Sequence, residues 1–207
     1  MPSMSVVEQA FCRSASWQIF TRRVILPWAL QGLRPHGQLL EMGAGPGAMA
    51  SDTARRFPDL RVTVTDIDPA MVESARQRLA SHTRVSVEQA DVTDLPFGDQ
   101  SFDYVASYLM LHHVIDWKRA IAEATRVLRP GGTFIGYDLT KTRAAGWIHQ
   151  VDRSPYRLIA IDEFEPAFEQ SGLETVGIRQ GLGGYVVRFV ADKPMTTPPP
   201  ALGGKSG

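Results

Sequence analysis

The sequence has few of the features that mark specialised classes of protein. It contains a single cysteine, Cys12, so it can form no internal disulfide and no cysteine-based metal site. We interpret Cys12 as a small apolar residue on an N-terminal helix, not as a catalytic thiol. Residues 1–9 show no basic start followed by an apolar run, and the apolar stretches 24–30 and 105–111 are too short to span a bilayer. We expect a cytoplasmic protein with no membrane partner and no metal.

Net charge is also lacking, since 22 lysines and arginines balance 22 aspartates and glutamates. Affinity for a phosphate backbone requires a basic excess that displaces counterions. We therefore expect no nucleic-acid partner, although Arg22 and Arg23, or residues 141–143, could form a local basic patch. A length of 207 residues fits one domain with a short appendage.

The sequence does contain strand-like and helix-like segments in alternation. The predicted strands are 38–42, 61–65, 85–87, 102–110 and 133–139, and the predicted helices between them are 48–57, 68–80 and 116–128. Such alternation implies crossover units and a parallel sheet, that is, the α/β class. After residue 138 the pattern changes: a helix at 161–171 precedes two strands, 173–178 and 185–190, which we predict as an antiparallel hairpin.

Three segments lie outside this alternation. Residues 6–31 carry apolar side chains at helical spacing, with a break or an end near Pro27, and we predict a helical lid within residues 1–36. Residues 37–193 form the main domain, inside which 141–160 has no clear periodicity. Residues 194–207 are rich in proline and glycine and are predicted to be a disordered tail.

A glycine loop, residues 41–47 (EMGAGPG), follows the first predicted strand. Its glycines let the backbone turn tightly and approach a ligand, and the next helix offers unpaired N–H groups. The loop also satisfies the loose dinucleotide fingerprint G-x-G-x-x-G/A, so a nicotinamide cofactor stays open at this point. Glu41 favours S-adenosyl-L-methionine, because a carboxylate repels a pyrophosphate but attracts ammonium and sulfonium charges. A tight turn without a ligand is the structural alternative.

Two carboxylates follow the next predicted strands. Asp66, about twenty residues after the loop, can accept hydrogen bonds from both ribose hydroxyls, which fits nicotinamide cofactors equally well. Asp91 can accept from an adenine amino group with Val92 against the ring, or can belong to a surface turn. We interpret Asp68 as a helix N-cap, with Pro69 at the first helical position.

Five sequence blocks, in order, resemble the class I S-adenosylmethionine-dependent methyltransferases, in particular the small-molecule, methyltransferase type 11-like branch. The blocks are the glycine loop and residues 64–71, 90–103, 111–114 and 126–132. The resemblance covers residues 39–140, with Met42 and Asp68 as small departures from the family's usual residues. It implies a Rossmann-like sheet of seven mostly parallel strands with an antiparallel last strand and helices on both faces. It also implies S-adenosyl-L-methionine as cofactor and S-adenosyl-L-homocysteine as product.

The resemblance further implies where the cofactor binds. The expected cofactor-binding residues are Glu41, Gly43, Ala44, Gly45, Gly47, Asp66, Ile67, Met71, Asp91, Val92 and Ser107. Glu41 and the glycines would face the methionine portion, Ile67 one face of the adenine, and the Ser107 backbone the ammonium group. In this family the segment matching 141–160 varies and usually binds the substrate.

Methyl transfer is an in-line displacement at a methyl group activated by a positive sulfur, so positioning and desolvation can supply much of the catalysis. A base is needed only when the nucleophile must lose a proton, as with a phenol of pKa about 10. The candidate catalytic residues are His112, His113 and His149, and the candidate substrate contacts are Trp17, Tyr108, Asp138, Trp147 and Tyr156. Packing or a surface position is the alternative for each.

We expect a monomer or homodimer that methylates an oxygen or nitrogen, or a carbon, of a small-molecule acceptor. Two other functions stay open: a nicotinamide-dependent oxidoreductase and a non-catalytic adenosylmethionine-binding protein. Glu41 and the later blocks speak against the first, and tight cofactor binding without turnover would indicate the second. Neutral charge and the lack of a recognition domain disfavour a nucleic-acid or protein methyltransferase.

Overall fold

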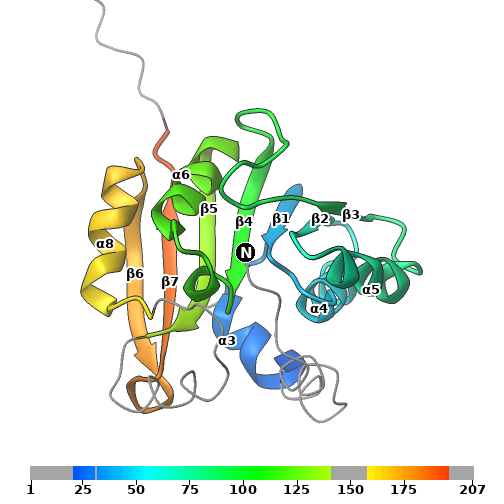
Figure 1. Ribbon diagram of the computed structural model, residues 1–207, viewed down its shortest axis with the longest axis horizontal. Helices are drawn as coiled ribbons and strands as arrows, with labels where there is room; N and C mark the ends of the chain where they lie inside the picture. Colours follow the sequence, from blue (N-terminus) through cyan, green and yellow to red (C-terminus); the bar gives the residue numbers. More distant parts are fainter. Residues whose placement is uncertain (1–20, 31, 141–157, 196–207) are drawn as a thin grey trace, which may run out of the picture.

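A seven-stranded sheet runs through the centre of the computed structural model, which describes residues 21–30, 32–140 and 158–195 (Figure 1). The strands are β1 (Gln38–Met42), β2 (Arg61–Asp66), β3 (Val85–Gln89), β4 (Phe102–Tyr108), β5 (Leu128–Leu139), β6 (Glu174–Gly181) and β7 (Val186–Asp192). Their order is β3-β2-β1-β4-β5-β7-β6. The first five are mutually parallel, and β7 is antiparallel to both β5 and β6. The predicted fold class is therefore confirmed.

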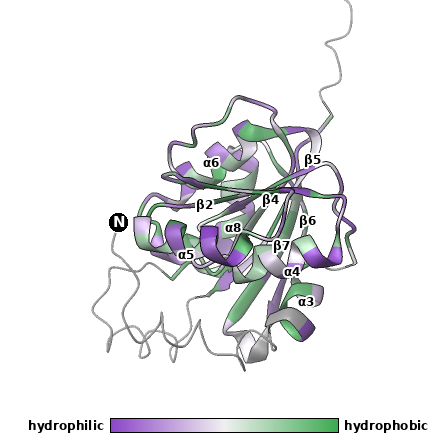
Figure 2. Cartoon of the chain, turned by 90° about the vertical axis from the view of Figure 1, so that its right-hand side faces the viewer, coloured by the Kyte–Doolittle hydropathy of each residue, from purple (hydrophilic) through white to green (hydrophobic). Residues whose placement is uncertain are grey.

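Helices cover both faces of the sheet. They are η1 (Thr21–Ile25), α3 (Leu26–Leu30), α4 (Ala48–Arg56), α5 (Pro69–Leu79), η2 (Leu111–His113), α6 (Trp117–Val127), α8 (Ile161–Gln170) and η3 (Leu182–Gly184). Apolar side chains of α3, α4 and α5 share one buried cluster with one face of the strands. Those of α6 and α8 share a second cluster with the other face. Figure 2 shows the resulting separation, with hydrophobic residues along the strands and hydrophilic residues on the outer sides of the helices.

Local sequence explains where these elements start. Strands β1 and β4 are almost continuously buried because helices cover both of their faces, whereas the edge strand β3 alternates with exposed residues. Helix α5 starts as predicted: the Asp68 side chain accepts the Ala70 backbone N–H at 2.8 Å, and Pro69 occupies the first turn. Asp116 caps α6 in the same manner, accepting the Arg119 N–H at 3.2 Å.

The boundary between α6 and β5 differs from the prediction. Residues 129–132 were expected to form a turn before a strand at 133, but β5 already begins at Leu128, directly after α6. Leu128 pairs with Phe102 of β4, and the register then shifts before Tyr104 pairs with Thr133; within this irregular stretch Gly131 has a φ of +79°. A distant part of the chain also holds the stretch. The Gly131 N–H donates to the Lys193 carbonyl at 2.7 Å, and the Lys193 N–H donates to the Gly132 carbonyl at 2.8 Å.

Only part of the predicted N-terminal helix is described. The chain changes from π-helical to α-helical at Leu26, beside Pro27, a residue that the first turn of a helix tolerates because it needs no N–H donor there. Cys12, Trp17, Trp147, His149 and Tyr156 lie outside the described residues, as do the predicted lid before residue 21 and the tail from residue 196. Of the helices that the structure describes, none has the length and apolar character needed to cross a bilayer.

Candidate functional site

The glycine loop between β1 and α4 lies at the carboxyl edge of the sheet, where the strand order reverses between β1 and β4. Gly43 and Gly45 have φ values of +60° and +55°, which disfavour any residue with a side chain. A Cβ on Gly43 would collide with the side chain of Met110, whereas one on Gly45 would meet nothing within 4 Å. The loop is therefore packed against the chain after β4 at Gly43 and open at Gly45.

Glu41, the residue of β1 before the last, is a buried carboxyl group at this edge, with 1% of its surface exposed. Its carboxyl accepts the backbone N–H of Ala50 in the first turn of α4, while Oε2 has no hydrogen-bond partner among the described residues. Burial raises the pKa of Glu41 from its ordinary 4.5 to about 8; the Ala50 amide opposes this and repulsion from Asp52 adds to it. A buried carboxyl oxygen with no donor among the described residues is a candidate to bind a donor group of a ligand. The ammonium of S-adenosylmethionine is such a donor group.

Asp66, at the end of β2, is held by the backbone around it. Its Oδ2 accepts the Gly45 N–H at 2.8 Å and its Oδ1 accepts the Asp68 N–H at 3.0 Å. Burial raises the pKa of Asp66, and these two amides oppose the rise. Each carboxylate oxygen keeps a second acceptor position, so the group can still accept from ribose hydroxyls.

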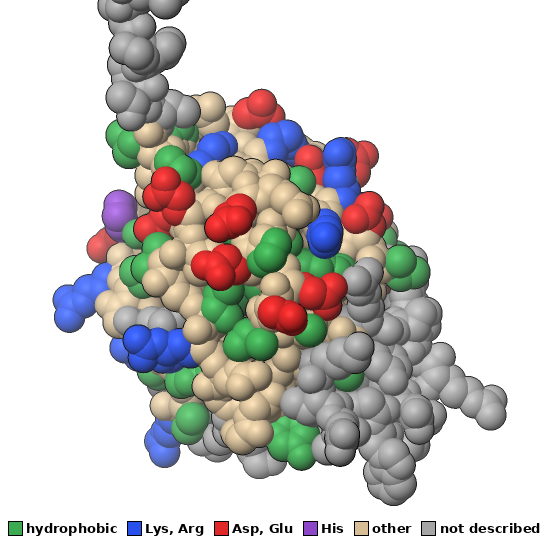
Figure 3. Space-filling view, turned by 90° about the vertical axis from the view of Figure 1, so that its left-hand side faces the viewer, with side chains coloured by type: hydrophobic (Ala, Val, Ile, Leu, Met, Phe, Trp, Pro, Cys, Tyr) green, Lys and Arg blue, Asp and Glu red, His purple; other side chains and the backbone are tan. Residues whose placement is uncertain are grey.

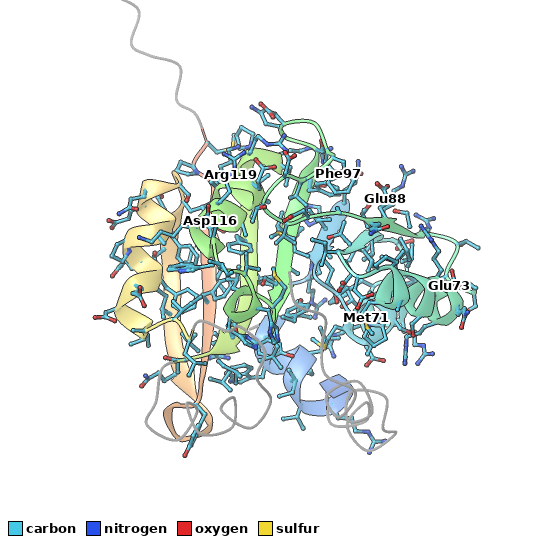
Figure 4. All side chains as sticks on the ribbon, in the orientation of Figure 1. Met71, Glu73, Glu88, Phe97, Asp116 and Arg119 are labelled. Atoms are coloured by element: carbon cyan, nitrogen blue, oxygen red, sulfur yellow. The ribbon has the colours of Figure 1, made fainter. Side chains whose placement is uncertain are left out.

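The predicted adenine contacts Ile67, Asp91 and Val92, and the predicted cofactor contact Met71, follow the neighbouring strands β2 and β3. Ile67 is half-buried, and Met71 and Val92 are 4% exposed. Figure 4 shows Met71 on the first turn of α5. Asp91 accepts both the backbone N–H and the hydroxyl of Thr93, at 2.8 and 2.7 Å. This is the turn considered as its structural alternative, so an adenine contact for Asp91 stays a prediction.

A buried histidine–aspartate pair occupies the same edge, beyond β4. The His112 Nδ1 hydrogen-bonds to Asp138 Oδ1, and the His112 backbone N–H donates to Asp138 Oδ2 at 3.3 Å. The two residues are 3% and 0% exposed. Because a carboxylate oxygen can only accept, Nδ1 is the donor in this bond.

The turn after β4 brings this pair together. Leu109 has a φ of +52°, unusual for a residue with a side chain, and its N–H donates to the Tyr137 carbonyl at 2.9 Å. The chain then turns into η2, which places His112 over Asp138 at the end of β5. Sequence reasoning missed the pairing, because Asp138 was expected to contact the substrate. The sequence did carry a signal for the pairing, because His112 follows β4, Asp138 lies near the end of β5, and these two parallel strands are neighbours.

The remaining candidate catalytic and substrate residues that the structure describes are His113 and Tyr108, together with Asp138 as a substrate contact. His113 is half-buried, with its ring centroid 4.0 Å from that of His112. Tyr108 is 8% exposed, and both its hydroxyl and that of Ser107 are buried without a partner. The full burial of Asp138 does not favour an acceptor contact, which stays a prediction. Within the described ranges, no three histidine, cysteine or acidic side chains are grouped as metal ligands.

Comparison with known proteins identifies the family of the domain that carries this site. Residues 40–136 match a family described as a methyltransferase domain. The chain carries a class I S-adenosylmethionine-dependent methyltransferase domain. This confirms the predicted family and argues against a nicotinamide-dependent oxidoreductase.

Several known methyltransferases are similar to this chain in sequence or in fold. The chain is 35% identical over 119 residues to a demethylmenaquinone methyltransferase of Clavibacter sepedonicus, covering 58% of this chain and 45% of that protein. It is 34% identical over 152 residues to the 27-O-demethylrifamycin SV methyltransferase of Amycolatopsis mediterranei, covering 69% and 56%. The chain thus spans about half the length of these curated relatives. A SAM dependent methyltransferase from Aquifex aeolicus shares the fold, with a TM-score of 0.74 at 16% identity, over 92% of this chain and 100% of that one.

Proposed function

We propose that this protein transfers a methyl group from S-adenosyl-L-methionine to an oxygen or nitrogen, or a carbon, of a small-molecule acceptor, and releases S-adenosyl-L-homocysteine. The observation that carries the proposal is the buried, unpartnered oxygen of Glu41 beside an open glycine loop, in a methyltransferase domain. A pyrophosphate would be repelled by Glu41 in its ionised form. A ligand with an ammonium group would be attracted.

The residues around the loop would hold the cofactor as follows. Glu41 would bind the ammonium, Gly43 and Gly45 would border the methionine portion, and Asp66 would accept from the ribose hydroxyls. Further contacts are assigned to Ala44, Gly47, Ile67, Met71, Asp91, Val92 and the Ser107 backbone. When bound, the cofactor supplies a methyl group on a positively charged sulfur, so the main work of the chain is to orient the acceptor in line with it.

His112 is the proposed base for acceptors that must lose a proton. Its Nε2 would take the proton, and Asp138 would stabilise the resulting imidazolium through the bond at Nδ1. Asp138 then acts as a positioning residue for His112. His113, whose ring lies beside that of His112, and His149, which lies outside the described residues, stay as further candidates for this role. Residues 1–36 and 141–160 stay the proposed lid and substrate segment.

Charge and relatives both support a small acceptor. Figure 3 shows acidic side chains across the face that carries α8, a helix with Asp162, Glu163, Glu165 and Glu169 and no basic residue. Such a face repels phosphate backbones. Both relatives are named for small acceptors, demethylmenaquinone and 27-O-demethylrifamycin SV. A small planar molecule with a hydroxyl or amino group is therefore the first class to test.

Calorimetric titration with S-adenosyl-L-homocysteine and, separately, with NAD tests the cofactor. We expect binding of the first only, and binding of NAD alone would overturn the proposal. Turnover is then followed by mass spectrometry as S-adenosyl-L-homocysteine formed in the presence of phenols, quinols or amines. Tight cofactor binding with no product across that panel would favour the alternative of a non-catalytic adenosylmethionine-binding protein.

A further inference from the structure

Tyr108, the last residue of β4, lies on the same sheet face as Glu41. Glu41 of β1 is the register partner of Ala106 on β4. Side chains two residues apart on a strand share a face, so Tyr108 stands one step from Glu41 toward the carboxyl edge. The electrostatics agree with this placement: after burial, the charge of Glu41 is the largest influence that raises the pKa of Tyr108 above its ordinary value.

The Tyr108 ring is held in place while its hydroxyl has no partner. The ring packs against Tyr137, with 5.5 Å between centroids, and the following residue, Leu109, is tied to the Tyr137 carbonyl. Both the Tyr108 hydroxyl and Glu41 Oε2 are buried, and neither bonds to the other or to any described group. Buried tyrosine hydroxyls usually find a partner. The Tyr108 hydroxyl and Glu41 Oε2 therefore lie on one sheet face and could both bind the same group of a ligand.

The chemistry of the two atoms selects that group. When Glu41 is ionised, its carboxylate only accepts hydrogen bonds, and a phenol oxygen can accept as well as donate. An ammonium has three N–H donors and a positive charge, so it can donate to both oxygens and also neutralise Glu41. A carboxylate or phosphate of the ligand would instead be repelled by the ionised form of Glu41.

We infer that Tyr108 and Glu41 together bind the ammonium group of the cofactor's methionine portion. Tyr108 is then a cofactor-binding residue and not the acceptor contact that was predicted. The inference rests on the proposed function, since it assumes that S-adenosylmethionine binds at the glycine loop.

Two ligands that differ at the amino acid portion test the inference by calorimetry. S-adenosyl-L-homocysteine carries the ammonium, and 5′-methylthioadenosine has the same nucleoside and a thioether but no amino acid portion. Tyr108→Phe should weaken binding of the first by about tenfold to a hundredfold, as expected for a hydrogen bond to a charged group, and leave the second unchanged. Tyr104→Phe is the matched control, because Tyr104 lies on the same strand and face but its hydroxyl bonds to His36 at 3.3 Å.

Equal affinity of wild type and Tyr108→Phe for S-adenosyl-L-homocysteine would overturn the inference, as would an equal loss for both ligands. Wild-type protein that binds neither ligand would instead refute the proposed function itself. Circular dichroism checks folding first; removal of an unpartnered hydroxyl should leave the unfolding temperature unchanged. If the phenylalanine variant does not fold, Tyr108→Leu removes the same hydroxyl and enters the same titrations.

Discussion

Replacing Glu41 by glutamine should stabilise the free protein and weaken its binding of the cofactor product. The pKa of Glu41 is about 8 in the folded protein against an ordinary 4.5. A raised folded-state pKa means that the folded form holds the proton more tightly. The stability contributed by this protonation is fully present below about pH 4.5 and is lost as the pH rises to about 8. Each pH unit in this window costs about 1.4 kcal/mol, at most about 3 kcal/mol by pH 7.

Urea unfolding without ligand at pH 5, 6, 7 and 8 measures this effect. Glutamine keeps the shape and can still accept the Ala50 N–H, but it does not ionise. We expect the free energy of unfolding of Glu41→Gln to rise relative to that of wild type by up to about 1.4 kcal/mol per pH unit. This difference should stop growing above pH 8. Glu73→Gln, an exposed carboxyl on α5, should show no such trend. Parallel stability curves for wild type and Glu41→Gln would refute the reasoning.

The same variant has the opposite effect on binding. If the ammonium binds an ionised Glu41, wild-type affinity for S-adenosyl-L-homocysteine falls by about tenfold per pH unit below about 8. Above that pH the ligand's own α-amino group, with a pKa of about 8, loses its charge and affinity falls again. Glu41→Gln should bind more weakly and lack the acid limb. Calorimetric titration across this pH range would count against the assignment if both proteins showed the same acid limb.

Three further predictions concern the neighbouring groups. Asp66→Ala should weaken the binding of S-adenosyl-L-homocysteine by about tenfold or more in calorimetry, because it removes the carboxylate that accepts from the ribose hydroxyls. Unchanged affinity would mean that the ribose assignment is wrong. His112→Gln and Asp138→Asn should each lower kcat for a phenolic acceptor by about 10²–10⁴ and leave cofactor affinity intact, and the double variant should lose little more than either single one. Arg188→Met should cost about 1–2 kcal/mol in urea unfolding, since Arg188 donates to the Trp28 carbonyl at 2.9 Å and lies over its ring; an unchanged midpoint would show that this contact does not hold α3.

Elements set by neighbouring residues were predictable, and elements set by distant pairing were not. The start of α5 follows from Asp68 and Pro69 alone, because an N-cap acts within one turn. The start of β5 does not, because proline and glycines at 130–132 indicate a turn. β5 starts at Leu128 because that residue pairs with Phe102 of β4, and the irregular stretch after it is also held by hydrogen bonds to Lys193, some sixty residues later.

The same division applies to the site. Glu41 and the glycine loop form one continuous segment whose chemistry can be interpreted directly. His112 and Asp138 are 26 positions apart, and their pairing requires β4 and β5 to be neighbours and Leu109 to adopt a positive φ. Asp91 shows the reverse limit, since its local turn with Thr93 competes with the ligand role that its position indicates.

The two faces of the sheet supply different parts of the proposed reaction. Tyr108 pairs with Tyr137 across β4 and β5, and both belong to the cluster under α3 and α4, the side of Glu41. Asp138 follows Tyr137 and therefore points to the other face, the side of α6 and α8, where it meets His112. The groups proposed to bind the ammonium thus lie on the first face, and the proposed base lies on the second. Substitutions at Glu41 should then change cofactor affinity, whereas those at His112 should change turnover and its dependence on the acceptor's acidity.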